Sequence, residues 1–535
     1  MKTILISAFL FLILCSCTRQ AAFDQEVIDQ AIENGRLANE AYVRSMNYVK
    51  GWLSKTDSAS GLIPTNLTIK TDLWEPHNSA ADNYAFMVLT TFLLDKELYK
   101  GEILDMLNSE RKLTSRIKSL PDTYSFSKRT FNTEIPDMNW VIFGTAEYMK
   151  DGLIPLCEYI GESPWKDRML EMLGDLPEYY TIFKDIDQLG GNKAASEEVN
   201  GDMLQSLVRT YWMTGKKEFL DWAILIGDYY MLGERDLSSV NLLRLRDHGC
   251  EIIGGLSELY VSLNFVLPEK KKQYQEPLYR LLDRVLEVGR NPDGLFYNAI
   301  NAETGEVINQ GISDNWGYIL DAFYSVFLID HTEKYRQAFL SIPENLNNKY
   351  RNFPWEGKSM DGYADAIEGG INLYNRESVP ALKEWIDSEI KVMWNFQKED
   401  GIIEGWHGDG NFARTSIMYG LWKTQGAFLQ PWRDDLILGA EKKDGEACFV
   451  LSAEKDWEGK LFFDSQRHKT HLNLPLDYPR INQFPEWFTV EEGKEYNLVS
   501  SQKKISGKIT GKVLLEGINV KLKAGEIQVF AIKKI

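Results

Sequence analysis

The chain has 535 residues, of which 44% are hydrophobic and 12% aromatic, and its formal net charge is −18. This length is enough for one large core and a second, smaller domain. Phosphate groups are bound by clustered Lys and Arg, so the acidic balance argues against nucleic acid and anionic membrane surfaces as partners.

The N-terminus has the pattern of a lipoprotein signal peptide, residues 1–17. Met1 and Lys2 precede an apolar run, residues 4–14, that is too short to span a bilayer. The run ends in Leu14-Cys15-Ser16-Cys17, which resembles the lipobox of bacterial lipoproteins. We predict cleavage before Cys17 and a lipid on its sulfur, against the alternative of an ordinary secretory signal. The expected location is the cell envelope, as an outer-membrane lipoprotein, with periplasmic exposure favoured because TRQAAF after Cys17 lacks an acidic cluster.

From about residue 24 to residue 425, helical patterns dominate the sequence. Segments 218–232 and 276–289 place apolar residues three and four apart, and the loops carry Gly, Pro, Asn and Asp. Some helices are amphipathic, such as 269–288, and are expected on the outside. Others open with a polar, glycine-rich cluster and then become apolar, and such openings recur about every 45 to 65 residues. The openings are residues 78–84, 137–140, 200–203, 247–251, 313–317, 361–365 and 407–411.

Asp, Asn and Ser in these openings are good N-caps, because their oxygens accept the free N–H groups of a first helical turn. Asp247 is expected to cap the helix that follows it. Capping does not account for the Trp, His, Tyr and Gly in the same few residues. If the helices close into a ring, the inner N-termini point to one end and the openings converge on one cleft.

The segment TGKKEFLDWAILIGDYY (214–230) resembles the hairpins of the six-hairpin glycosidases. The resemblance implies a mainly α fold, an (α/α)6 toroid of helical hairpins over residues 18–432. After about residue 433, EACFVLSA, KLFFDSQ, KVLLEGINVKL and GEIQVFAIKK alternate in polarity between turns. This pattern predicts a small C-terminal β-sandwich, residues 433–535. The proline-rich segment 477–488 is expected to be an ordered loop that packs the sandwich on the toroid, in preference to a sugar site.

A toroid followed by a sandwich is most similar to the bacterial β-glucuronidase family of Bacteroidetes lipoproteins, glycoside hydrolase family 154. The resemblance implies an exo-acting glycoside hydrolase that releases a terminal uronic acid, β-glucuronic acid, from complex glycans. A polysaccharide lyase or an unsaturated glucuronyl hydrolase on the same fold is the alternative. A non-catalytic glycan-binding lipoprotein is the third possibility. Linkage, anomer and oligomeric state are left open by the sequence.

Hydrolysis of a glycosidic bond needs two carboxyl groups, one acid and one base or nucleophile. Glu251 is the first candidate, because it lies one turn inside a helix, where burial would raise its pKa toward that of a proton donor. Gly254 and Gly255 follow it and allow close packing. Asp314 and Asp202 are the next candidates, since they occupy equivalent openings.

Recognition of a uronic acid needs positive charge. The planar fork of Arg414 suits a carboxylate best, and His248 and His407 lie beside the predicted mouth. Tyr363 and these two histidines would serve a lyase. The tryptophans could stack on sugar faces or belong to the core. The remaining substrate-binding candidates are Trp74, Asn78, Asp82, Trp140, Asn200, Asn315, Trp316 and Trp406.

No cofactor or metal is expected. Cys250 lies beside His248 and Glu251, but Cys157 and Cys448 are distant in sequence and no C-x-x-C spacing supports a closed tetrahedral site. Three scattered cysteines also make no disulfide framework.

Overall fold

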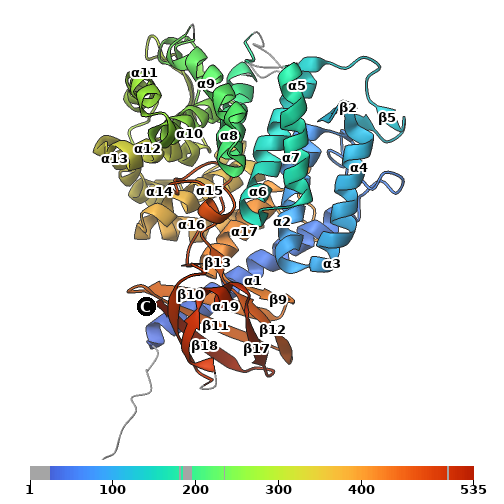
Figure 1. The fold of residues 1–535 in the computed structure, drawn as a ribbon, viewed down its shortest axis with the longest axis vertical. Coiled ribbons are helices and arrows are strands. Elements are labelled where there is room, and N and C mark those ends of the chain that lie inside the picture. The colour runs from blue at the N-terminus through green and yellow to red at the C-terminus, as the bar shows by residue number, and fades with distance from the viewer. Residues whose placement is uncertain (1–23, 180–181, 185–194, 234, 503–504) are drawn as a thin grey trace, which may run out of the picture.

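The computed structural model describes residues 24–179, 182–184, 195–233, 235–502 and 505–535. The predicted signal peptide and the lipidation site Cys17 lie outside these residues. The described chain forms a large helical body and a smaller body of β-sheets beneath it (Figure 1). Within it, no helix has the length and apolar character needed to cross a membrane.

The helical body is built from hairpins that pair a fully buried helix with a half-exposed one. Residues 250–263 of α10 (Cys250–Val266) are all buried. Its partner α11 (Pro268–Val288) buries one face only, which is the pattern of an outer helix. The inner helices are η1 (Pro76–Tyr84) with α2 (Ala85–Leu94), α5 (Met138–Glu147) with η3 (Tyr148–Leu153) and α6 (Ile154–Ile160), α8 (Ala195–Thr214), α10, α12 (Trp316–Asp330), α15 (Met360–Arg376) and α17 (Asn411–Lys423).

The inner helices close into a ring. Each inner helix packs on the next, and α17 returns to α2. The predicted fold class, a mainly α toroid of helical hairpins followed by a small sandwich, is confirmed. In the part of the chain that the structure describes, the inner helices number seven, one hairpin beyond the six of the namesake class. The outer helices are α1 (Gln25–Leu53), α4 (Leu104–Thr114), α7 (Pro164–Asp175), α9 (Lys217–Met231), α11, α13 (Glu333–Leu340) with α14 (Pro343–Lys349), and α16 (Pro380–Trp394).

The predicted helical segments 218–232 and 276–289 are α9 and the second half of α11. Short strands that the sequence did not predict precede several inner helices. They form small antiparallel sheets in the connections, where few side chains are available to show a two-residue alternation. These strands are β1 (Leu73–Trp74), β4 (Tyr124–Ser125) and β5 (Thr130–Phe131); β2 (Ser115–Ile117) and β3 (Leu120–Pro121); and β6 (Leu243–Arg244), β7 (Tyr297–Ile300) and β8 (Val307–Ile312).

The predicted capping holds in part. Asp137 caps α5, since its carboxylate accepts from the backbone N–H of Asn139 at 3.0 Å. The prediction that Asp247 caps α10 is wrong: the N-cap is Gly249, without a side-chain bond. His248 adopts a positive φ of 67°, and the carboxylate of Asp247 lies 2.9 Å from its ring Nε2. The opening 200–203 lies inside α8 rather than before it, because the Ala- and Glu-containing residues from Ala195 are already helical.

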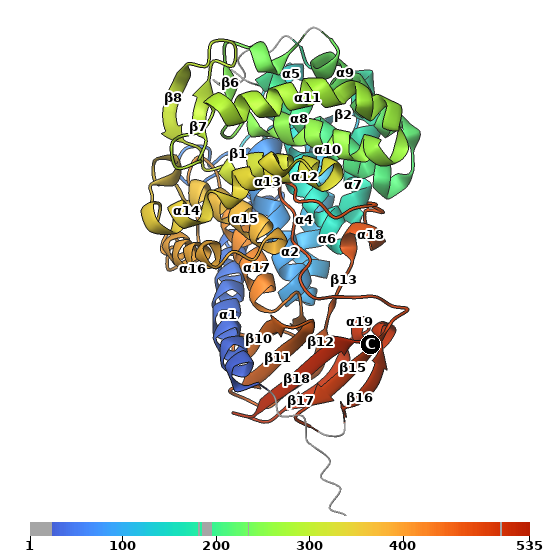
Figure 2. The ribbon, with the colours of Figure 1, turned by 90° about the vertical axis from the view of Figure 1, so that its left-hand side faces the viewer.

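The C-terminal sheets form the predicted sandwich around a core of their own. The outer helix α1 runs alongside this sandwich (Figure 2). It meets the sheet at Gly35 and Gly439, where a Cβ on Gly439 would lie 1.9 Å from the carbonyl oxygen of Ala31. One sheet has the order β10 (Leu436–Lys443), β11 (Glu446–Ala453), β18 (Ile527–Lys534), β15 (Glu495–Ser500) and β16 (Gly507–Thr510); the other has the order β17 (Ile518–Leu522), β12 (Trp457–Phe462) and β9 (Phe428–Gln430).

One predicted strand is partly wrong, because its first residues form the short helix α19 (Gly511–Leu515) before β17 begins. A second departure concerns the middle of the sandwich. Between β13 (Asp464–Ser465) and β14 (Thr489–Val490) the chain leaves the sheets, and the short helix α18 (Arg467–Thr470) and the residues after it pack among the helices. Apolar side chains of this return segment, residues 466–488, belong to the helical core: Leu472, Leu474, Tyr478, Ile481 and Phe484. The predicted domain boundary at residue 433 stays a prediction, since residues after it return to the helical body.

Candidate active site

A cleft of about 510 Å³ opens at the end of the toroid where the inner helices begin. Every inner helix, or the loop before it, contributes to its lining, as the convergence of the openings predicted. Two of the contributing segments, η1 and η3, are π-helical, a distortion that is frequent at functional sites. The lining is rich in charged groups and poor in apolar ones, with Trp140, Phe143 and Ile481 among the exceptions.

Glu251 lines this cleft from the first turn of α10. Gly201 of α8 packs against it so closely that an added Cβ would lie 2.4 Å from the carbonyl carbon of Glu251. Its side chain accepts a hydrogen bond from the thiol of Cys250 at 3.2 Å, and Oε2 has no hydrogen-bond partner among the described residues. Burial raises the pKa of Glu251 to about 7, although the nearby ammonium of Lys150 opposes the shift. The carboxyl group is therefore about half protonated at pH 7, where an ordinary glutamate is ionised.

Lys150 is a buried cation beside Glu251. Its Nζ lies 2.8 Å from Asp151 and 3.8 Å from both Asp202 and Glu251. Burial disfavours the ammonium, yet the surrounding carboxylates raise the pKa of Lys150 well above its ordinary value. Asp202 is fully buried and is not part of the lining, so it lies behind Lys150. Burial and neighbouring carboxylates raise the pKa of Asp202 well above its ordinary value.

Among the residues that the structure describes, two groups of carboxylates and histidine have the spacing of a metal site. In one, Glu147, Asp151 and Asp202 offer oxygens within 4.8 Å of one another. The ammonium of Lys150 already pairs with Asp151 in this group and supplies the positive charge that a metal would bring. In the other, His468, Asp477 and Glu486 belong to the return segment, and Asp477 is already paired with two arginines.

Asp247, His248 and Glu198 form a charged row at the cleft. The His248 ring lies between the two carboxylates, with Nδ1 paired to Glu198 and Nε2 2.9 Å from Asp247. Burial disfavours the imidazolium, but the two carboxylates raise the pKa of His248 well above its ordinary value. Burial likewise opposes the charge on Asp247, yet His248 and the guanidinium of Arg246 hold the pKa of Asp247 well below its usual range. Asp247 is thus an ionised carboxylate in the same cleft as Glu251, whose pKa is about 7.

Two further acidic residues, Asp82 and Asp409, lie near His407, where η1 and α17 approach the cleft. Nε2 of His407 lies 3.6 Å from Asp82, and both residues line the cleft. Burial raises the pKa of Asp82 to about 7, against the pull of His407. Asp409 is next to them. Burial raises its pKa to about 6, and His407 opposes this shift too.

Arg414 reaches the cleft but is paired with protein carboxylates and amides. Its Nη2 donates to Asp365 at 2.7 Å, and Nε lies 2.9 Å from Glu368. Its Nη1 donates to Asn411 at 2.9 Å and to Asn482 at 3.0 Å. The fork predicted to bind a substrate carboxylate is already occupied by two protein carboxylates.

The other candidates divide into lining residues and core residues. Asn78, Trp140, Asn315 and Trp406 line the cleft, and Trp406 has 84% of its surface exposed. Asn200 instead bonds the backbone of Phe183 and the hydroxyl of Tyr230. The predicted site residues that are buried and, in the described structure, do not line the cleft are Trp74, Asn200, Asp202, Asp314, Trp316 and Tyr363.

Several lining residues were missed from the sequence. Lys150 and Asp151 stand in the otherwise apolar run YMKDGLIPL, residues 148–156, and a charged pair there is a usable signal. His77 precedes a predicted opening by one residue, and burial lowers its pKa to about 4, so it is neutral. Asn482 lies in the return segment, far along the chain, and no local pattern points to the cleft.

Neither a protein-family model nor a curated protein matches the sequence. Among solved structures, an α-1,6-mannanase of glycoside hydrolase family 76 from Salegentibacter sp. HEL1_6, bound to α-1,6-mannotetrose, is 10% identical over 71% of this chain and 97% of its own, with a TM-score of 0.37. A cellobiose 2-epimerase from Bacillus thermoamylovorans B4167 is 13% identical over 71% and 98%, with a TM-score of 0.38. A family 76 mannosidase from Bacteroides thetaiotaomicron VPI-5482 is 12% identical over 71% and 98%, with a TM-score of 0.38. At this distance the site must be interpreted from its own residues.

Proposed function

We propose that the protein is a glycoside hydrolase that binds the end of a glycan in this cleft and uses Glu251 as its general acid. One observation carries the proposal: a carboxyl group whose pKa is raised to about 7, Glu251, and one whose pKa is held well below its usual range, Asp247, line the same cleft. Acid and base roles in glycosidases are set by environments that separate the pKa values of two carboxyl groups in this way.

In the proposed reaction Glu251 donates its proton to the oxygen of the glycosidic bond as that bond breaks. The ammonium of Lys150, 3.8 Å away, stabilises the carboxylate that Glu251 becomes. Asp247 then acts as the ionised partner, either on a water molecule or directly on the sugar carbon. The buried Asp202 lies 3.8 Å from Nζ of Lys150 and outside the lining, so any effect it has on the reaction passes through Lys150.

The closed floor of the cleft supports an exo-acting enzyme. Ile481 and Asn482 of the return segment belong to the lining and are buried, so this segment closes the cleft on its side and a glycan would enter through the mouth on the opposite one. Trp406 lies at that mouth with most of its ring exposed, a position suited to stacking on a sugar.

The charges of the lining favour a neutral terminal sugar over the uronic acid that the family resemblance implies. Arg414 is paired with Asp365 and Glu368, and Arg246 is paired with Glu356. A uronate would have to displace one of these carboxylates or remain close to several others. Release of glucuronic acid is the second candidate activity, and the assay below tests it beside release of a neutral sugar.

The lyase alternative finds less support. The hydroxyl of Tyr363 is buried away from the lining, and His248 is held as an imidazolium, which cannot accept a proton. A lyase leaves a C4–C5 double bond in its product, whereas a hydrolase incorporates oxygen from water.

The test compares wild type with Glu251→Gln on matched β-glucosides, β-glucuronides and natural oligosaccharides. We expect release of a free monosaccharide, labelled in ¹⁸O-water, with no new ultraviolet absorbance, and faster turnover of the neutral substrate. Unsaturated product, or binding without turnover by the wild type, would overturn the hydrolase proposal.

A further inference from the structure

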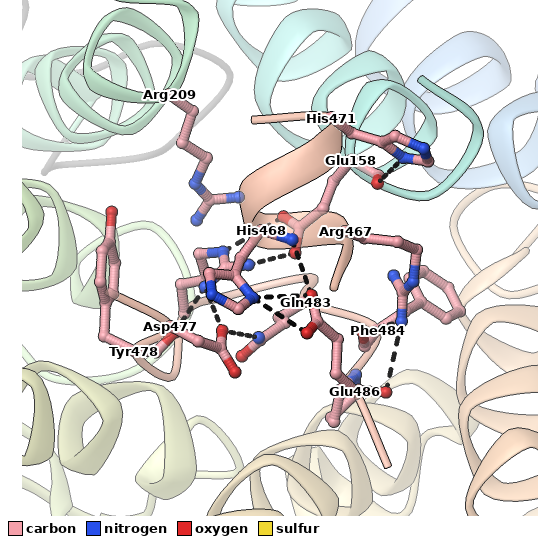
Figure 3. A network of polar contacts seen from close by, with 12 residues as sticks. Glu158, Arg209, Arg467, His468, His471, Asp477, Tyr478, Gln483, Phe484 and Glu486 are labelled. Atoms are coloured by element: carbon pink, nitrogen blue, oxygen red, sulfur yellow. Dashed lines mark hydrogen bonds and ion pairs between the residues drawn. The ribbon is translucent and has the colours of Figure 1, made fainter. Parts of the chain in front are cut away.

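The return segment closes the lower end of the toroid, and side chains of the inner helices hold its backbone. Arg209 of α8 donates to the carbonyl oxygen of Ile481 at 3.2 Å. Ser325 of α12 donates to that of Pro479 at 3.0 Å, and Asn372 of α15 to that of Arg480 at 3.3 Å. Figure 3 shows Asp477, Tyr478 and Gln483 of the segment beside Arg209 and Glu158 of the helices. The backbone of residues 479–481 is therefore fixed from several sides of the ring.

A buried ion pair anchors the same stretch. Arg480 is buried and donates to both carboxylate oxygens of Glu158 of α6, through Nε and Nη2. It also donates to the carbonyl oxygen of Tyr478 at 2.6 Å and to Asp477 at 3.1 Å. Breaking a buried pair of this kind destabilises strongly, so the two residues that follow are held in a defined place.

Asn482, two residues after Arg480, reaches the floor of the cleft. It has a φ of 60° and is 1% exposed. Its backbone N–H donates to Glu368 at 2.6 Å, and its Oδ1 accepts from Arg414 at 3.0 Å. Its Nδ2 donates to Oδ1 of Asp151 at 2.7 Å. Every polar group of the side chain therefore contacts a charged residue of the site.

The contact with Asp151 leads directly to the acid. The same oxygen of Asp151 also pairs with Nζ of Lys150 at 2.8 Å, and that nitrogen lies 3.8 Å from Glu251. The positive end of the Asn482 amide thus faces a carboxylate whose charge determines where Lys150 lies. Removing the amide would make the surroundings of Glu251 more negative and let the ion pair shift.

We propose that Asn482 is a positioning residue that the C-terminal part of the chain supplies to the active site, where it holds the Asp151–Lys150 ion pair against Glu251. The inference rests on the proposed role of Glu251. It assigns the return segment a part in the reaction, beyond the packing of the sandwich on the toroid.

The experiment uses the full chain with Asn482→Ala and Asn482→Asp, and with Asn375→Ala as the matched control. Asn375 also anchors the segment, through a 2.9 Å bond to the carbonyl oxygen of Glu486, but it is outside the lining. We expect Asn482→Ala to lower kcat roughly 10- to 100-fold, because small displacements of catalytic groups have effects of this size. KM and the melting temperature should change no more than in the control.

The pH dependence of kcat distinguishes a positioning role of Asn482 from a merely structural one, because a structural role would leave it unchanged. In Asn482→Asp the added carboxylate disfavours ionisation of Glu251, so the alkaline limb of kcat should move upward by about one pH unit. The limb of Asn375→Ala should coincide with that of the wild type. A kcat for Asn482→Ala within threefold of wild type, or an equal loss in the control, would overturn the inference.

Melting curves need no substrate, so they distinguish a failure of this inference from a failure of the proposed function. Asn482→Ala adds no titratable group, so it should shift the pH dependence of the melting temperature around pH 7 through Glu251, and the shift should vanish in a Glu251→Gln background. Persistence of the shift in that background refutes the coupling even if no glycan is ever cleaved. Its disappearance supports the coupling whatever the reaction is.

Discussion

The replacement Glu251→Gln tests the ionisation on which the proposed chemistry depends. Glutamine keeps the shape of the side chain and the oxygen that accepts from Cys250, but it has no proton to lose. Below the ordinary pKa of 4.5, Glu251 is neutral in both the folded and the unfolded chain. As the pH rises from there to about 7, the unfolded chain ionises and the folded one does not. Wild type therefore loses stability over this window, and the variant does not.

The size of the effect follows from the same two values. A separation from 4.5 to about 7 corresponds to roughly 3 kcal/mol, at about 1.4 kcal/mol per unit, once the pH exceeds the folded value. The side chain is 5% exposed, so solvent screening reduces this figure little. We expect wild type and variant to be equally stable near pH 4 and the variant to be more stable at pH 7 and above.

The assay is urea unfolding of both proteins at pH 4, 5.5 and 7.5, together with turnover at pH 7. Turnover should fall by about 10²–10⁴ in the variant, the usual share of general acid catalysis, while substrate binding persists. A stability difference that is constant across this pH range, or that favours wild type at pH 7.5, would refute the assigned ionisation. A variant with more than about a tenth of wild-type turnover would pass the acid role to Asp82, whose pKa is also about 7.

Four further outcomes are expected. Lys150→Met should lose about 3–5 kcal/mol in urea unfolding at pH 7, because it removes the cation of a buried ion pair, and less at pH 5, where Glu251 is protonated; equal losses would contradict this. Arg414→Ala should be destabilised by a similar amount and lose activity equally on glucosides and glucuronides, whereas a selective loss on glucuronides would make it a substrate contact. Trp406→Ala should leave unfolding within about 0.5 kcal/mol of wild type but raise KM several-fold for oligosaccharides over aryl glycosides. Cys17→Ala should move the protein from the membrane to the soluble fraction with full activity, and unchanged attachment in fractionation would exclude lipidation at this residue.

Much of the architecture follows from local patterns. A buried helix such as α10 is apolar on all sides and an outer helix such as α11 on one, so periodicity separates the two kinds. The polar openings had to converge once the ring closed, which is why Glu251, His248 and Asn315 meet in one cleft. The prediction that Trp316 and Tyr363 line the cleft was wrong. Successive residues of a helix are turned by about 100°, so a residue one position along can face the core instead.

The rest depends on contacts between distant parts of the chain. Whether Arg414 is free or paired is decided by Asp365 and Glu368, and no spacing in the sequence reveals that pairing. The role expected of Asp247 as a cap failed because His248 took a positive φ and competed for the carboxylate. Asn482 bonds Asp151 across more than 300 residues, and periodicity carries no information at that distance.

The path of the return segment has a consequence for how such a protein is made and how it can evolve. Synthesis on the ribosome delivers the chain from its N-terminus, so the last inner helix is complete while residues 477–486 are still to emerge. Until they arrive, the ring has no floor, and the carbonyl-binding side chains of Arg209, Ser325 and Asn372 have nothing to bind. Fragments that stop before residue 477 should accumulate without a finished site. A gene fusion that joined this toroid to a foreign C-terminal part would likewise remove Asn482, so the two halves must be inherited together.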